Sequence, residues 1–124
     1  MKIRPVLSPI IFKQQSPLKK NWLKGKMPSV KKGIYGGELT KDNVTLEHIL
    51  PLSKGGTNDL SNLALAVGKN NWNRGAEPLI KVLKPEDYEN YIRQFKNVSL
   101  PDIDGKKYVE SLNLTVERVI ANGD

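Results

Sequence analysis

The alternation of apolar and polar residues predicts two short strands and a short helix in the middle of the chain. Residues 44–49 alternate with the period of a strand, and the pattern ends before Pro51. Residues 60–67 (LSNLALAV) form a second apolar run, which is interpreted as a second strand. Residues 69–74 are expected to form a short helix that ends at Gly75. The expected order is therefore strand, loop, strand, helix.

A longer helix is predicted over residues 84–97. Pro85 suits the first turn of a helix, and Glu86 and Asp87 complement the positive end of the helix dipole. Four apolar residues recur at helical spacing and give one stripe, which is expected to face the core. These residues are Tyr88, Tyr91, Ile92 and Phe95.

The end of the chain is expected to form a loop over residues 101–107 and a last helix over residues 115–121. Thr115 is the predicted N-cap of that helix, and Gly123 lies just past its end. A chain of 124 residues has the size of one domain. Together the elements predict a single α+β domain.

Positive charge is concentrated at the N-terminus. Residues 1–33 carry nine Lys or Arg and no acid, whereas residues 34–124 carry eleven basic and thirteen acidic residues. Four prolines in this segment exclude one long helix. We interpret residues 1–32 as a basic N-terminal arm that attracts polyanions, with nucleic acid first and an anionic membrane second. A merely solubilising arm is the alternative. Residues 33–124 are then the domain.

Basic groups and an aromatic side chain alternate in this arm. Lysines surround Trp22, which suits a phosphate backbone and a stacked base or sugar. The alternative, which we favour slightly, is that Trp22 anchors the arm to the core. The lysines expected to bind nucleic acid here are Lys19, Lys20, Lys24, Lys26, Lys31 and Lys32.

Composition excludes several classes of protein. No run of about 18 apolar residues exists, so no membrane span is expected. No signal-peptide pattern follows the first basic residues. Cysteine is absent, which excludes disulfides, cysteine-bound zinc and thiol catalysis. The absence of cysteine also fits a cytoplasmic location.

The candidate chemistry lies between residues 45 and 75. This segment holds the only histidine, His48, directly after Glu47. A lone histidine is more often structural, but imidazole can also take a proton from water near neutral pH. A carboxylate with amide oxygens and water is an oxygen-only ligand set that suits Mg²⁺ or Mn²⁺ better than zinc. On a regular strand Glu47 and His48 point to opposite faces, unless a bulge or twist re-aims one.

Four short elements follow one another at fixed spacing in this segment: Glu47-His48-Ile49-x-Pro51, Lys54-Gly55-Gly56-Thr57-Asn58, Asn62-Leu63 and Asn71-x-x-Arg74-Gly75. Their order and spacing resemble those of the HNH endonuclease family. The resemblance covers about a quarter of the chain and implies a ββα-metal fold, in which two strands and a helix hold one divalent ion. Residues 45–75 would be the core of that unit, and residues 84–124 a helical tail.

The resemblance implies a role for several residues. His48 would be the general base that activates water for attack on phosphorus. Glu47 and Asn71 would hold Mg²⁺ (or Mn²⁺), with Asn70 and Asn73 as alternatives to Asn71 because the run of asparagines leaves the register open.

Other residues of the segment are expected to support the reaction. Asn62 would brace the loop and position the region of His48, and Arg74 would be a phosphate clamp because its guanidinium can bind two oxygens. Lys54 and Lys69 are further candidates for nucleic-acid contact. Asp59 is expected to order the loop rather than to bind metal.

Two departures from the family pattern affect these expectations. Glu47 stands where many relatives have Asp, and its longer side chain could shift the ion. Many relatives also carry cysteine pairs that bind a structural zinc, whereas this chain has Gly33, Gly36, Val67 and Asn70 there, so no structural zinc is expected. Packing of apolar side chains should replace the zinc. The candidates are the stripe of residues 88–95 and, outside it, Ile34, Tyr35, Val67 and Trp72. Trp72 is expected in the core rather than in contact with DNA.

The resemblance implies a metal-dependent endonuclease that hydrolyses DNA, with double-stranded DNA as the expected substrate. A small enzyme of this type resembles those of phages and mobile elements, so a phage or host protein partner or a homodimer is also expected. The first alternative is an HNH-like module that binds nucleic acid with little activity. The second is a basic RNA-binding or ribosome-associated protein, although no strand carries the aromatic face of an RNA-recognition sheet.

Overall fold

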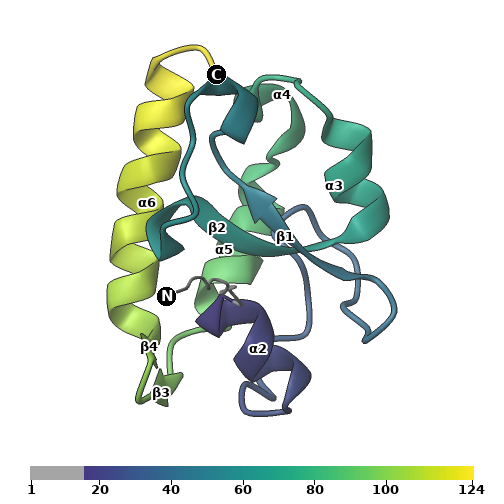
Figure 1. The fold of residues 1–124 in the computed structure, drawn as a ribbon, viewed down its shortest axis with the longest axis vertical. Coiled ribbons are helices and arrows are strands. Elements are labelled where there is room, and N and C mark those ends of the chain that lie inside the picture. The colour runs from purple at the N-terminus through teal and green to yellow at the C-terminus, as the bar shows by residue number, and fades with distance from the viewer. Residues whose placement is uncertain (1–15) are drawn as a thin grey trace, which may run out of the picture.

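The computed structural model describes residues 16–124, and residues 1–15 of the expected arm lie outside the described residues. The described part is a mixed α+β fold, as predicted, with five helices and two small antiparallel sheets. In Figure 1 the last helix runs along one side of the molecule and α3 (Gly68–Arg74) lies on the other, with the hairpin of β1 (Val44–His48) and β2 (Leu63–Val67) crossing between them. The α-helices are α2 (Pro17–Leu23), α3 (Gly68–Arg74), α4 (Leu79–Val82), α5 (Pro85–Arg93) and α6 (Gly105–Ala121).

The predicted pair of strands is confirmed. Strands β1 (Val44–His48) and β2 (Leu63–Val67) pair in antiparallel register, from Val44 opposite Val67 to His48 opposite Leu63. The second strand begins later than the apolar run because Leu60–Asn62 forms a 3₁₀ turn, η3. Helix α3 follows β2 directly, close to the predicted helix over residues 69–74.

Strand β2 has one edge that β1 does not cover, and tyrosine hydroxyls cover part of it. Tyr91 accepts a hydrogen bond from the Leu65 amide (2.9 Å), and Tyr108 donates to the Leu63 carbonyl (2.7 Å). The two hydroxyls also bond to each other at 2.9 Å. Because the Tyr108 proton goes to Leu63, Tyr91 is the donor in that bond, and every group in this buried chain has a partner.

Helix α5 places its apolar stripe in the core, as predicted. Tyr91 and Phe95 are fully buried, and Tyr88 and Ile92 pack against the core from partly exposed positions. The Phe95 ring packs against Tyr91 and Tyr108, at centroid distances of 5.0 and 4.9 Å. The helix is shorter than the predicted range of residues 84–97, and it begins at Pro85 as expected.

The last helix is longer than predicted. Helix α6 begins at Gly105 with Asp104 as its N-cap, and Thr115, the predicted N-cap, is buried in its middle. The Thr115 hydroxyl donates to the Ser111 carbonyl within the helix, so it caps nothing. The predicted loop over residues 101–107 instead contains strand β4 (Ile103–Asp104), which pairs with β3 (Ser99–Leu100).

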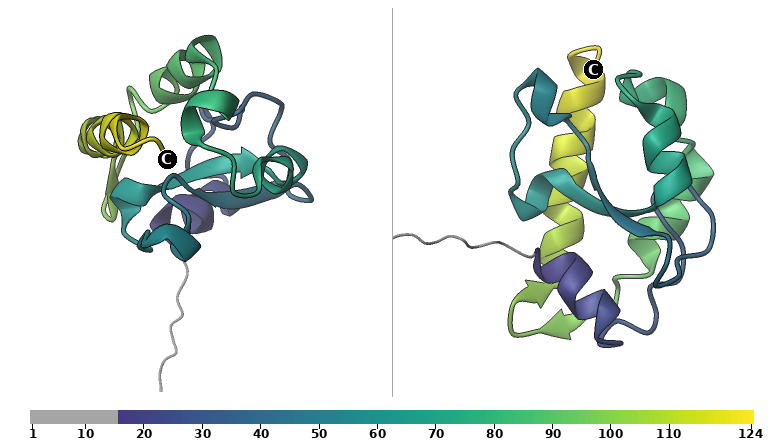
Figure 2. Two further views of the ribbon diagram at one scale, coloured as in Figure 1. Left: turned by 90° about the horizontal axis from the view of Figure 1, so that it is seen from above. Right: turned by 45° about the vertical axis from the view of Figure 1, so that its right-hand side comes forward.

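The described part of the expected arm, residues 16–32, packs on the rest of the domain. Leu18, Met27 and Val30 are buried in the common core, and the Trp22 indole donates to the Val30 carbonyl at 2.7 Å. Helix α2 lies beside the β3–β4 hairpin at one end of the molecule in Figures 1 and 2, where Asn21 donates to Asp102. The core position that we favoured for Trp22 matches this packing.

Within residues 16–124, no helix has both the length and the apolar character that a membrane crossing requires.

The tyrosine chain generates a prediction about alkaline pH. Burial raises the pKa of Tyr91 and of Tyr108, so both phenols keep their protons when an unfolded tyrosine, with a pKa of about 10, loses its own. The two raised pKa values contribute to the free energy of unfolding, and this contribution is complete below pH ~10. It is lost as the pH rises further, by up to about 1.4 kcal/mol per pH unit for each tyrosine. We expect the free energy of unfolding, measured with urea from pH 8 to 11.5, to fall less steeply above pH ~10 in the double variant Tyr91→Phe/Tyr108→Phe. Parallel curves would contradict this origin of the pH dependence.

Candidate active site

The loop between β1 and β2 depends on two glycines and one asparagine. Gly55 adopts a φ of 94°, in the left-handed region. A Cβ atom on Gly56 would lie 1.8 Å from the Leu50 carbonyl oxygen, so no side chain fits there. The buried Asn62 side chain accepts from the Leu50 amide (2.8 Å) and donates to the carbonyls of Leu50 (3.0 Å) and Thr57 (2.8 Å). These are the contacts of a residue that braces the loop after His48.

His48 lies at the end of β1 and its ring contacts the loop. Its Nε2 atom lies 2.7 Å from Oδ1 of the exposed Asn58. With an amide oxygen as the acceptor, Nε2 carries a proton, and in the neutral ring Nδ1 then holds the free lone pair. The imidazole is therefore held by a loop residue in a form that can accept a proton at Nδ1.

Glu47 is buried on β1 and forms an ion pair. Its Oε2 atom lies 3.0 Å from Nη1 of Arg74, and the exposed fractions of the two side chains are 7% and 1%. The Tyr35 hydroxyl donates to the same oxygen. Burial and the Glu47 carboxylate both raise the pKa of Tyr35, so the phenol stays neutral and remains a donor.

Arg74, the candidate phosphate clamp, is buried and its guanidinium is bound by protein groups. Its Nη1 atom also donates to the His48 carbonyl at 3.1 Å, and its Nε donates to the Glu77 carbonyl at 3.1 Å. Its Nη2 atom is buried and has no hydrogen-bond partner among the described residues. The physical reason for this placement is that the buried Glu47 carboxylate needs a compensating charge, and Arg74 supplies it from α3.

Asn71 lies against β1 on the side of Glu47. Its amide nitrogen donates to the Thr45 hydroxyl and to the Leu46 carbonyl, both at 3.1 Å. Thr45 and Glu47 are two residues apart on a strand, so their side chains share a face. Of the two alternatives, Asn70 donates to the Gly36 carbonyl and Asn73 is exposed on α3.

The oxygen atoms in this region have the chemistry that a hard divalent ion prefers. Oε1 of Glu47 and Oδ1 of Asn71 form no hydrogen bond with the residues that the structure describes. One carboxylate and one amide oxygen, completed by waters, fit Mg²⁺ or Mn²⁺, which keeps several waters when bound. The Arg74 ion pair lowers the net negative charge at Glu47. Over residues 16–124 no cluster of three or more His, Cys, Asp or Glu side chains is suited to a metal.

Two of the eight lysines expected to contact nucleic acid are engaged elsewhere. Lys20 forms an ion pair with Asp102 at 3.3 Å. Lys54 lies 3.8 Å from the Asp124 carboxylate and donates to the Ala76 carbonyl, so it holds the C-terminus of the chain. The other six form no ion pair with the described residues: Lys24, Lys26, Lys31, Lys32 and Lys69 are exposed, and Lys19 is half-buried.

Trp72 is exposed, so its expected place in the core is wrong. Its exposed fraction is 87%, because α3 is short and turns Asn71 and Arg74 toward β1 while Trp72 faces away. The other packing candidates behave as expected: Ile34 is buried, and Tyr35 and Val67 pack against the core.

Sequence reasoning missed Tyr35 and Asn58 as parts of the site. Tyr35 was expected only to pack, and Asn58 was matched only as the end of the glycine-loop element, with no role of its own. No local pattern links either of them to residues 47 and 48, since Tyr35 reaches Glu47 from the segment before β1. The only available signal for Asn58 was its place in the loop that follows His48.

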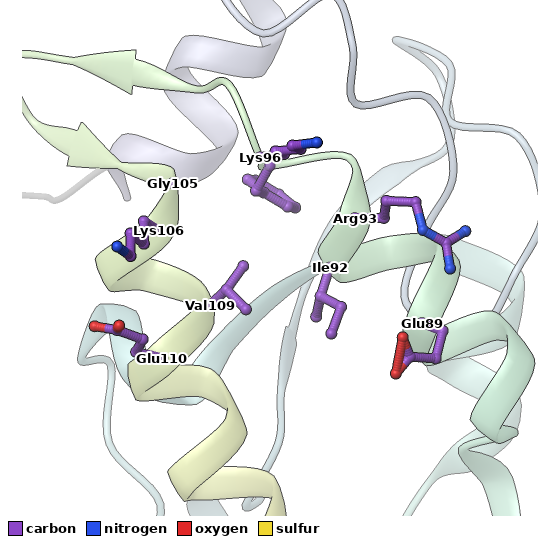
Figure 3. Close-up of a pocket in the computed structure, with 9 residues that line it drawn as sticks. Glu89, Ile92, Arg93, Lys96, Gly105, Lys106, Val109 and Glu110 are labelled. Carbon is purple, nitrogen blue, oxygen red and sulfur yellow. The ribbon is translucent and has the colours of Figure 1, made fainter.

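A separate hollow of about 410 Å³ lies between α5 and α6 (Figure 3). Ile92 and Val109 project into it from the two helices, and charged side chains surround it. No residue of the candidate site lines this hollow.

Comparisons with protein-family models, with curated proteins and with solved structures find no match to this chain.

The ion pair generates a prediction about stability. Glu47→Gln and Arg74→Met each leave a buried charge without its partner, so each should lower the free energy of unfolding by about 3–5 kcal/mol. The double variant removes both charges and should lose clearly less than the sum of the two single losses. Urea unfolding of the four proteins measures this coupling. Additive losses would show that the two charges do not depend on each other.

Proposed function

We propose that the protein is a metal-dependent endonuclease of the HNH type that hydrolyses phosphodiester bonds in DNA. The observation that carries the proposal is the place of His48, which ends a strand beside Glu47 and is held by the Asn58 amide. Around it, β1, the glycine loop, β2 and α3 follow one another in the order of a ββα-metal unit. The resemblance of residues 45–75 to the family supports the same conclusion.

In this proposal His48 takes the proton from the attacking water. The bond from Nε2 to Asn58 leaves Nδ1 as the accepting atom, and it holds the ring against rotation. The proton passes from water to Nδ1 as the water oxygen attacks phosphorus and the bond to the 3′ oxygen breaks. Asn62 acts at a distance by holding the loop that carries Asn58.

Glu47 and Asn71 would hold Mg²⁺ or Mn²⁺ through Oε1 and Oδ1. When bound, such an ion stabilises negative charge on the phosphate and on the leaving oxygen. Arg74 and Tyr35 keep the Glu47 carboxylate fixed through its other oxygen. Exposed lysines of the segment after α2 would bind the phosphate backbone, with an affinity that falls steeply as salt rises.

The Glu47–Arg74 ion pair also favours a second candidate, an HNH-like module that binds DNA with little activity. A carboxylate that already has a cationic partner attracts a divalent ion less strongly than a free one. The two candidates differ in cleavage and agree in binding, so one experiment separates them.

The proposal predicts metal-dependent cleavage that requires His48. Supercoiled plasmid is incubated with the wild type and with His48→Ala in Mg²⁺, Mn²⁺ or EDTA, and the products are separated on agarose. We expect the wild type to cut with metal only, and the variant to cut about 100-fold more slowly or not at all. Cleavage in EDTA, or full cleavage by the variant, would rule out this mechanism. Binding without cleavage in every metal would support the module.

A further prediction concerns Asn58 as a positioning residue. Asn58→Ala removes the acceptor that holds the His48 ring, and such a misplacement costs about 100-fold in rate. Asn97→Ala, a change at an exposed asparagine after α5, is the matched control and should cleave like the wild type.

The role of Asn58 is tested further in a variant that lacks His48. In a protein that already carries His48→Ala, adding Asn58→Ala should cause no further slowing of cleavage. The bond that Asn58→Ala removes is already gone in that protein. An additional loss there would mean that Asn58 acts on the substrate or the metal and not through His48.

A further inference from the structure

Trp72 is the most exposed of the large hydrophobic side chains in the described part of the chain. Its exposed fraction of 87% exceeds that of Leu114 at 65% and Ile80 at 61%. Tryptophan has the largest apolar surface of any side chain, and exposed tryptophans are enriched where a partner covers them. No described residue covers the indole.

The indole forms one wall of an open hollow of about 490 Å³. The other lining residues are Thr45, Gly68, Asn71 and Gly75. Gly68 and Gly75 have no side chains, so the walls they form are backbone and the hollow stays open beside the ring. Asn71 also lines the hollow, which therefore lies next to the proposed metal site. A flat aromatic face with open space beside it suits a flat ligand that stacks on the ring.

One cation beside the indole favours an anionic ligand. Lys69 is exposed and lies three residues before Trp72, so the two side chains are neighbours on α3. Within residues 16–124 Lys69 has no ion-pair partner. A cation next to an aromatic ring suits single-stranded nucleic acid, with the base on the ring and the phosphate on the cation.

We propose that this hollow binds an unstacked base of DNA on the face of Trp72, next to the site at Asn71. In a paired duplex the faces of each base are covered by its neighbours, so the indole can stack only on a base that has left the stack. Unstacking a paired base costs a few kcal/mol, and a single-stranded or bulged base avoids most of this cost. The preferred substrate is therefore DNA with an unpaired base beside the bond that is cut. The cleavage part of this statement rests on the proposed function, whereas the binding part does not.

Binding is tested without cleavage. Three fluorescein-labelled DNAs are titrated in EDTA by anisotropy: a single strand, a duplex and the same duplex with one bulged base. We expect Trp72→Ala to weaken binding of the single strand and of the bulge about 5- to 150-fold, the loss caused by removing a stacked aromatic. Binding of the paired duplex should change less than twofold. Trp72→Phe keeps a smaller ring and should restore part of the affinity.

Leu114→Ala on α6 is the matched control, since it removes another exposed apolar side chain outside the hollow. It should leave all three affinities unchanged. The chain has two tryptophans, and Trp22 is held through its Nε1 atom by Val30. Tryptophan fluorescence of the wild type should therefore be quenched by the single strand, and this quenching should disappear in Trp72→Phe.

Several results would overturn the inference. One is an equal loss of affinity for all three DNAs in Trp72→Ala, and another is no loss for any. A third result has two parts: the fluorescence of Trp72 changes with protein concentration alone, and sedimentation shows a dimer that Trp72→Ala abolishes. That result would mean that the indole binds a second copy of the chain.

Failure of the inference and failure of the proposed function are distinguishable. Plasmid cleavage that requires His48, with no effect of Trp72→Ala on any DNA, refutes only the base-binding hollow. Quenching and selective binding without cleavage in any metal refute only the nuclease.

Discussion

A two-stranded hairpin cannot stand alone in water, and the fold depends on how the free edge of β2 is covered. The hydroxyls of Tyr91 and Tyr108 bond to Leu65 and Leu63 and to each other, and they bring α5 and α6 onto that edge. The Ile34 amide donates to the Leu65 carbonyl on the same strand. Because these bonds are buried and complete, the last third of the chain supports the hairpin directly.

The Glu47–Arg74 ion pair is the second constraint, and it connects the fold to the candidate chemistry. The ion pair joins β1 to α3. Arg74 also donates to the His48 carbonyl, so it fixes the backbone of the proposed general base. The same pair takes up part of the charge that a divalent ion would use, so stability and metal affinity are opposed at this position. The Nη2 atom of Arg74 is buried and has no partner among the described residues, which lowers the free energy of unfolding, and other contacts of the fold offset this loss. The ion pair is therefore the feature on which the two proposed functions differ.

Local patterns determined much of the fold but less of the site. Strands β1 and β2 and helix α5 follow from hydrophobic period and from Pro85, and α3 follows from the stop at Gly75, because these features act over a few residues. Helix α6 was missed over its first ten residues, since the buried Gly105 and Thr115 in it are weak helix signals that tertiary packing overrides. The packing of the segment around α2 was predicted only for Trp22, because prolines and lysines mark a segment as exposed, while only the core shows that Leu18 and Met27 fit it.

The sequence by itself determined the order of elements, the position of the glycine loop, and the concentration of His48, Glu47 and the asparagines in one segment. The spacing of those residues along the chain is local information. Only the tertiary structure decided that Arg74 turns inward, that Tyr35 reaches Glu47, that Asn58 holds His48, and that Trp72 faces outward. The physical reason is that a charge or a ring is buried or exposed according to the partners that the whole fold brings to it, and those partners are distant in sequence.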